Sequence, residues 1–233
     1  MCNNNDCYRE LSMKKLWMFV IVCCILGNLI ASEWDTDETA EFEKYRIEAE
    51  KGDIEAIYYA GVYYILGRGV KMDLSQGYSM ISEAAEKGFP AAQNWMGDFS
   101  ADIYSEAEMA KAVAWWNKAA RQGDPNAQFS LGQCYEQGSG VPQDMKTAVY
   151  WYQLAADQNV SDAKFALSSC YLEGKGVKKN VKEAYFWILL CFPDSWDESY
   201  DSIEVIARQL KPAAIKKVKA RAMKWMDAHR EER

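Results

Sequence analysis

Apolar and polar residues between about 42 and 192 alternate with the period of an α-helix. In the stretch from Pro125 to Gln137, Ala127, Leu131 and Tyr135 lie four residues apart and form one stripe along a helix. The next stretch places a second apolar set on one helical face, which we expect to be buried: Ala148, Trp151, Tyr152, Ala155 and Ala156. The pattern predicts two consecutive amphipathic helices.

This helix pair recurs along the chain. Gly52, Gly88, Gly123 and Asn159 are separated by 36, 35 and 36 residues. Four more sets of residues keep the same register: Ala56, Ala92, Ala127 and Ala163; Gly61, Gly97, Gly132 and Ser168; Tyr64, Ser100, Tyr135 and Tyr171; and Gly77, Ala112, Ala148 and Ala184. A period of this length predicts a stack of helix pairs.

The connections inside the pairs also recur. A Gly-x-Gly-Val loop stands at 67–70, 138–141 and 174–177, and each is followed by a residue that can cap the next helix: Asp73, Asp144 or Asn180. Glycine ends a helix readily because it adopts left-handed backbone angles at no steric cost. The second pair has 101–104 in place of this loop, so we expect a different connection there.

These motifs resemble the Sel-1-like repeat family, which is related to the tetratricopeptide repeat. The resemblance rests on Leu131-Gly132 with Tyr135, on the glycine loops, on Trp115-Trp116 with Lys118-Ala119-Ala120, and on Trp151-Tyr152 with Ala155-Ala156. It implies an all-α fold, a right-handed α/α superhelical solenoid of about four helix-turn-helix repeats. We place the repeats at 52–87, 88–122, 123–158 and 159–192.

Capping helices are expected at both ends of the repeats. Residues 33–51 form the N-terminal cap, in which 42–51 resemble the second helix of a preceding repeat. Residues 193–233 form the C-terminal cap, with helices expected at 197–210 and 212–229. In the second of these, several basic residues surround an apolar stripe.

The first 32 residues follow a different pattern. Arg9, Lys14 and Lys15 precede an apolar run that begins at Leu16, and acidic residues follow the run. This arrangement is typical of a signal peptide or a short N-terminal membrane anchor. It predicts export to the periplasm or cell envelope, with membrane contact only through this segment.

The amino-acid composition argues against several classes of function. The net charge of −7 argues against a nucleic-acid partner, because phosphate is repelled by an acidic surface. His229 is the single histidine, and no glycine loop carries a phosphate-binding lysine followed by serine or threonine. We therefore predict no catalytic residues, no cofactor and no metal.

Cysteine usage bears on a further alternative. Some cysteine-rich relatives in this family are described as β-lactamase-like, and they carry a disulfide in each repeat. Here Ala119-Ala120 and Ala155-Ala156 occupy the corresponding positions. We expect Cys134 and Cys170 to be buried free thiols, and an enzyme is the less favoured alternative.

The resulting hypothesis is a non-enzymatic module that binds another protein. The family resemblance leaves two roles open: an adaptor in the cell envelope, or an immunity protein that neutralises a secreted antibacterial effector such as a phospholipase. Tyr59 and Trp95 share a position where later repeats have Ser130 and Ala166, so the repeat does not require rings there. We therefore predict a partner-binding surface at Tyr59, Tyr63, Trp95, Asp98 and Tyr104.

Overall fold

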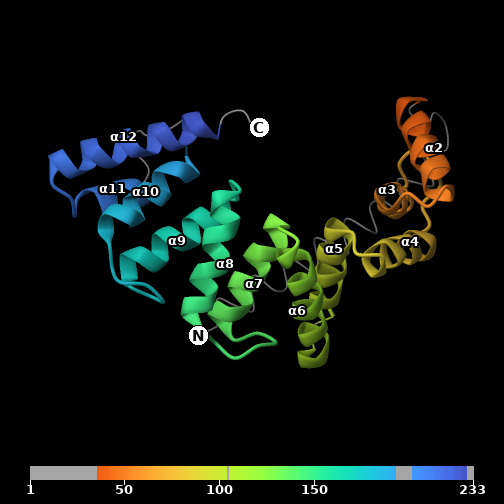
Figure 1. The fold of residues 1–233 in the computed structure, drawn as a ribbon, viewed down its shortest axis with the longest axis horizontal. Helices are drawn as coiled ribbons and strands as arrows, with labels where there is room; N and C mark the ends of the chain where they lie inside the picture. The colour runs from red at the N-terminus through yellow and green to blue at the C-terminus, as the bar shows by residue number, and fades with distance from the viewer. Residues whose placement is uncertain (1–35, 104, 193–200, 230–233) are drawn as a thin grey trace, which may run out of the picture. The chain divides into compact units, whose positions relative to one another are not determined.

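The computed structural model describes residues 36–103, 105–192 and 201–229, and the regular elements in these ranges are all α-helices (Figure 1). They pair as helix-turn-helix units, which confirms the predicted all-α repeat fold. The helices are α2 (Thr36–Glu50), α3 (Ile54–Leu66), α4 (Leu74–Glu86), α5 (Pro90–Ala101), α6 (Glu106–Arg121), α7 (Pro125–Gln137), α8 (Met145–Asp157), α9 (Ser161–Glu173), α10 (Val181–Cys191), α11 (Asp201–Ala207) and α12 (Pro212–Ala228).

The chain divides into two compact parts, residues 1–80 and 81–233, and the division falls inside α4. In the first part, α2 packs on α3. In the second, each helix from α5 to α10 packs on the next, and α11 and α12 both pack on α10.

The second helix after each glycine loop begins at the expected capping residue. The carboxylate of Asp73 accepts a hydrogen bond from the backbone N–H of Gln76 at 2.9 Å. Asp144 accepts from Lys146 at 3.0 Å, and Asn180 caps α10 in the same way. These bonds satisfy backbone donors that have no partner within the helix.

The turns between repeats use the expected left-handed residues. Gly52, Gly88 and Gly123 have positive φ, and Asn159 takes the same conformation at φ 71°. Asn159 is the one non-glycine residue with positive φ among the residues described. Asparagine tolerates this region better than most residues, which explains its place in a glycine column.

The glycine loops bring successive repeats together. Gly138 ends α7 with left-handed angles, and Gly140 lies so close to α6 that a Cβ there would sit 2.9 Å from the carbonyl oxygen of Met109. Gly176 lies in the same way against Met145 at the start of α8. The second repeat has no such glycine: α5 ends at Ala101 and α6 starts after Ser105, so the predicted different connection is confirmed.

The first glycine loop makes the same contact with α2. A Cβ on Gly69 would collide with the backbone of Glu38 and Thr39. Glu38 precedes Met109 by two repeat steps, so α2 receives the contact that the second helix of a preceding repeat would receive.

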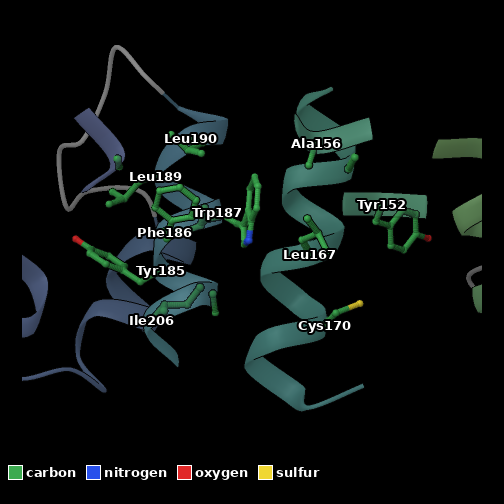
Figure 2. Packing of buried hydrophobic residues seen from close by; sticks show 14 of the residues in the cluster. Tyr152, Ala156, Leu167, Cys170, Tyr185, Phe186, Trp187, Leu189, Leu190 and Ile206 are labelled. Atoms are coloured by element: carbon green, nitrogen blue, oxygen red, sulfur yellow. The ribbon is translucent and has the colours of Figure 1, made fainter. Parts of the chain in front are cut away.

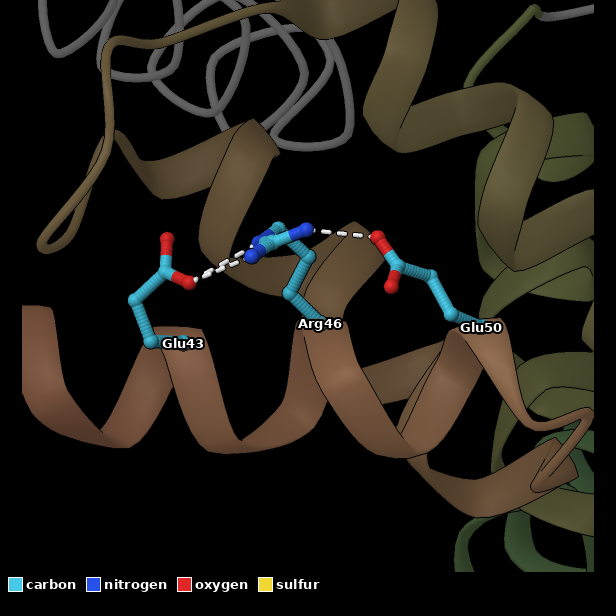
Figure 3. A network of polar contacts seen from close by, with 3 residues as sticks. All are labelled: Glu43, Arg46 and Glu50. Atoms are coloured by element: carbon cyan, nitrogen blue, oxygen red, sulfur yellow. Dashed lines mark hydrogen bonds and ion pairs between the residues drawn. The ribbon is translucent and has the colours of Figure 1, made fainter.

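Helix α2 is polar on most of its surface and is supported by ion pairs along its length. Arg46 donates to Glu43 at 2.8 and 2.9 Å and to Glu50 at 2.5 Å (Figure 3). Pairs with this spacing stabilise an exposed helix by about 0.2–0.5 kcal/mol each.

Within a repeat, a glycine on the first helix makes room for a ring on the second. A Cβ on Gly97 would lie 2.5 Å from the indole of Trp116, and a Cβ on Gly132 would overlap the ring of Tyr152. In the fourth repeat Ser168 replaces the glycine and Ile188 takes the ring's position. There the Ser168 hydroxyl donates to the carbonyl oxygen of Ala184 at 2.8 Å.

A chain of glutamine side chains links consecutive repeats. The amide of Gln128 donates to the carbonyl oxygen of Ala120 at the end of α6, at 3.2 Å. Its own oxygen accepts from Gln158, at the end of α8, at 2.8 Å. One step earlier, the amide of Gln93 donates to the carbonyl oxygen of Ala85 at the end of α4, and the Gln93 oxygen accepts from Gln122, which follows α6.

The largest apolar core lies at the C-terminal end. Residues Ala184 to Leu190 of α10 are all buried, because α9 covers one side of this helix and α11 and α12 cover the others (Figure 2). Trp187 points toward Leu167 on α9, whereas Tyr185 and Leu189 point away from it. Helix α11 lies inside the expected range 197–210, and α12 ends one residue before the end of the expected range 212–229.

The structure corrects one expectation about the core. Trp151 is half-buried, whereas its neighbour Tyr152 is 1% exposed and lies against Gly132. Trp116, one repeat earlier, is also the buried member of its pair. The second ring of each aromatic pair therefore fills the core.

We expect Tyr152→Ala to lower the free energy of unfolding by about 3–5 kcal/mol, through lost burial and a cavity. Trp151→Ala should cost about half as much, since its ring stays partly in water in the native state. Urea unfolding followed by circular dichroism compares the two. A larger loss for Trp151→Ala would reverse the assignment of the buried ring.

Candidate functional site

Two predicted site residues lie on α3 and pack against α2. The rings of Tyr59 and Tyr45 are stacked at a centroid distance of 5.0 Å, and Tyr63 lies 5.8 Å from Tyr45. Tyr63 also contacts Phe42, which is 4% exposed. Both tyrosines are therefore half-buried parts of the interface between the two helices.

This packing corrects the expectation that the fold does not require a ring at position 59. The first repeat places Tyr45 of α2 opposite this position, and the two rings cover one another. Burial raises the pKa of Tyr63 to about 12, so its hydroxyl stays protonated at neutral pH. A role of Tyr59 and Tyr63 in binding stays a prediction.

Trp95 and Phe99 form a surface ring pair on α5. Their rings are stacked at 5.4 Å with an interplanar angle of 10°. Trp95 is half-buried and Phe99 is 41% exposed, so part of this aromatic area faces water. Tyr104, predicted to belong to the same surface, lies outside the described residues.

Asp98 lies on α5 beside this pair and also has a structural contact. One carboxylate oxygen accepts a hydrogen bond from the indole N–H of Trp116 at 2.9 Å, and the other accepts from Asn94 at 3.2 Å. Although the residue as a whole is exposed, desolvation around the carboxylate raises its pKa, and the bond from Trp116 opposes that rise. Asp98 therefore holds the core indole in place.

A second candidate site, which we call the C-terminal cleft, was not foreseen from the sequence. It has a volume of 490 Å³ and is formed by α8, α9, α10 and α12. Its lining combines four aromatic rings with charged and polar groups: Gln153, Asp157, Tyr171, Glu183, Phe186, Trp187, Arg221, Lys224, Trp225, Ala228 and His229.

Arg221 joins two helices along one wall of the C-terminal cleft. Its guanidinium donates to Glu183 of α10 at 2.5 Å and lies over the ring of Phe186 at 3.8 Å. A cation held by both an ion pair and a ring face is fixed in position. Lys224, one turn further along α12, lines the same wall and is exposed.

The end of the C-terminal cleft is organised around Trp225. The ring of His229 stacks on it at 3.9 Å, and the His229 Nδ1 atom lies 2.8 Å from the Trp225 carbonyl oxygen. The ammonium group of Lys164 also lies over the Trp225 ring, 5.0 Å from its centroid. Lys164 is 2% exposed and donates to the carbonyl oxygen of Leu190 at 3.3 Å.

Asp157 at the end of α8 supplies a carboxylate to the cleft wall formed by that helix. It accepts a hydrogen bond from Gln153 at 2.9 Å. Burial raises the pKa of Asp157, while Gln153 and the nearby His229 act in the opposite direction.

The C-terminal cleft could not be found from the repeat pattern, because α12, which forms one of its walls, lies outside the repeats. One signal was present: α12 has five Lys or Arg residues around an apolar stripe, on a chain that is acidic overall. Arg221 and Lys224 are exposed, as basic residues on a solvated face are expected to be, and they also line the cleft.

The cysteine expectation is confirmed. Cys134 and Cys170 are buried free thiols, and burial raises the pKa of each to about 11. A thiol with such a pKa is protonated and unreactive at neutral pH.

Two other kinds of site are absent from the residues that the structure describes. Across 36–103, 105–192 and 201–229, no three His, Cys, Asp or Glu side chains are grouped so as to hold a metal ion. In the same ranges, no helix has the length and apolar character needed to cross a membrane. The predicted signal or anchor segment, 1–32, lies outside the described residues.

The fold defines a class of protein, the α/α repeat proteins built from stacked helix pairs. Within that class, the Sel1 repeat family matches residues 54–89, 90–124, 125–160 and 161–190, which together are more than half of the chain. The chain belongs to the Sel1 repeat family. Repeats of this family generally serve as non-enzymatic modules for protein–protein interaction.

Two solved structures share this fold. A protective antigen of uropathogenic Escherichia coli strains, with an SLR fold, is 30% identical at a TM-score of 0.69 and covers 80% of this chain and 40% of its own. A Sel1 repeat protein from Oxalobacter formigenes is 27% identical at a TM-score of 0.64, over 75% of this chain and 50% of its own.

A curated relative matches this chain over a shorter length. An uncharacterized protein of Neisseria meningitidis is 30% identical over 102 residues, which are 44% of this chain and 21% of the relative. The chain thus spans about a fifth of that relative and half or less of the two structures.

The contact between Asp98 and Trp116 leads to a prediction about pH. Asp98→Asn keeps an acceptor for the indole N–H, whereas Asp98→Ala removes it and should be about 1 kcal/mol less stable than Asp98→Asn at every pH. The raised pKa of Asp98 means that the protonated form is favoured by folding. Its contribution is fully present below the unfolded-state pKa and is lost as pH rises through the folded-state pKa.

Urea unfolding of wild type and both variants at pH 3 and pH 7 checks this. The free energy of unfolding of wild type minus that of Asp98→Asn should be lower at pH 7 than at pH 3. A difference between the two proteins that does not change with pH would contradict the assignment.

Proposed function

We propose that this chain is a non-enzymatic adaptor that is exported to the cell envelope and binds another protein there. The observation that carries the binding role is the Trp95–Phe99 ring pair on α5, which keeps aromatic area on the surface. Large rings supply contact area at a low cost in conformational entropy and dominate the binding energy of many interfaces.

Other exposed rings support the same role. Tyr150 on α8 is 57% exposed and Phe165 on α9 is 52% exposed, although both helices have well-packed opposite faces. Exposed aromatic residues of this size indicate surfaces that are covered in a complex when they gather in patches. The Trp95–Phe99 pair is such a gathering within one helix turn.

The titratable groups described above favour binding over catalysis. Asp98 holds Trp116, and Cys134 and Cys170 are protonated core residues. The single histidine, His229, stacks on Trp225 instead of facing a nucleophile. These groups have structural partners that account for their positions.

Export is proposed from the sequence of residues 1–32. The basic residues before the apolar run and the acidic residues after it orient a signal segment so that the repeats leave the cytoplasm.

One experiment in intact bacterial cells tests both parts. The full chain, tagged at its C-terminus, carries the photo-crosslinking residue benzoylphenylalanine in place of Phe99, and a matched version carries it in place of the exposed Glu106. After irradiation, the periplasmic and cytoplasmic fractions are separated and the tagged species are compared.

We expect a protein adduct from position 99 in the periplasmic or membrane fraction. The yield of adduct from position 106 should be much lower. Recovery of the tag in the cytoplasm only would refute export. Equal labelling at both positions would refute the assigned surface. An adduct with an antibacterial effector would identify the adaptor as an immunity protein.

A further inference from the structure

We propose that the C-terminal cleft binds an acidic peptide segment of a partner protein, with a bulky apolar side chain of that segment seated on the aromatic floor. The proposal rests on the protein-binding function above and names a second surface for it, together with the chemistry of its ligand.

The floor of the C-terminal cleft is suited to an apolar side chain. Phe186 and Trp187 of α10 form its buried base, while Tyr171 and Trp225 are half-buried and border it. A volume of 490 Å³ falls in the range of sites that hold a ligand or several side chains. The rings of Tyr171 and Trp225, which keep part of their area exposed, give an apolar group a surface to pack on.

One edge of α12 supplies positive charge beside that floor. Lys217, Arg221 and Lys224 lie four and three residues apart and so follow one side of the helix. Arg221 is already bonded to Glu183 and stacked on Phe186. Lys224 lines the cleft, and Lys217 is exposed one turn before Arg221.

The acidic groups of the C-terminal cleft do little to repel an acidic ligand. Glu183 is neutralised by its ion pair with Arg221. Asp157, on the wall formed by α8, accepts a hydrogen bond from the Gln153 amide. The lining itself is balanced, with Glu183 and Asp157 against Arg221 and Lys224, and the positive excess beside the cleft comes from Lys217 on the exposed edge of α12.

Charge is also distributed unevenly along the sequence, with the acidic excess before the last repeat and a basic excess from that repeat onward. Residues 1–158 contain 13 Lys and Arg against 23 Asp and Glu, whereas residues 159–233 contain 14 against 11. An acidic segment is therefore repelled by most of the chain and attracted to its C-terminal end. Such asymmetry guides a partner to one surface and sets its orientation.

A basic or uncharged segment fits this surface less well. Arg221 already occupies the ring face of Phe186, and Lys164 occupies one face of Trp225, so cations of this chain fill two aromatic positions that a basic ligand would use.

Selection from a library of random twelve-residue peptides displayed on phage, against the immobilised full chain, tests the proposal. Enriched peptides are synthesised with a fluorescent label, and their dissociation constants are measured by fluorescence anisotropy for wild type and for Lys224→Glu. The matched control is Lys216→Glu, which makes the same charge change at an exposed position of α12 outside the cleft lining.

We expect the enriched peptides to combine several Asp or Glu residues with a large apolar residue. Lys224→Glu should weaken their binding about tenfold or more, Lys216→Glu should change it less than about threefold, and added salt should weaken it further. Circular dichroism verifies that both variants are folded.

Three results would overturn the proposal: a basic or uncharged consensus, acidic peptides bound equally by Lys224→Glu, or no enrichment at all. Peptides that bind equally to Lys224→Glu but are lost on Phe99→Ala would leave the proposed function in place and remove only the cleft. Enrichment of acidic peptides without an adduct at position 99 would support the cleft as a binding site and contradict the surface on which the proposed function rests.

Discussion

The missing side chain at Gly97 and Gly132 is the constraint on which the repeat stack depends. Because neither residue has a Cβ, the rings of Trp116 and Tyr152 lie directly on the backbone of the preceding helix. Protein interiors are packed at the density of organic crystals, so this contact fixes the separation and rotation of the two helices. The fourth repeat meets the same constraint with Ser168 and Ile188, a larger residue facing a smaller one.

Other features of the stack follow from this pairing. With the helix pair fixed, the side-chain amides of Gln93 and Gln128 donate hydrogen bonds to carbonyl oxygens at the end of the preceding second helix. The next glutamine side chain, Gln122 or Gln158, donates in turn to Gln93 or Gln128. Lys164 occupies the corresponding place in the fourth repeat and also reaches Trp225 of α12. A polar link between repeats thus becomes, at the last repeat, a link to the helix that forms the C-terminal cleft.

Much of the fold could be predicted because it is periodic. The glycine and alanine columns identified the helix pairs, and the glycine loops identified their connections. The rotation of each helix about its own axis was harder to predict from the sequence. Trp151 and Tyr152 are adjacent, and packing against Gly132 decides which of the two is buried. Asp98 lies in a column of mostly polar residues, so its bond to Trp116 eighteen residues away left no local signal. The C-terminal cleft was missed because four helices contribute to it, and α12 lies outside the repeats.

The most direct test of this account is a double-mutant cycle at Gly132 and Tyr152, followed by urea unfolding of the full chain. Gly132→Ala alone should lower the free energy of unfolding by about 1–3 kcal/mol through overpacking. The exposed neighbour Gln133→Ala should change it by less than about 0.5 kcal/mol. In the Tyr152→Ile background, which imitates the fourth repeat, Gly132→Ala should cost at least about 1 kcal/mol less. Equal costs in both backgrounds would contradict the claim that glycine and ring set the stacking of the helices.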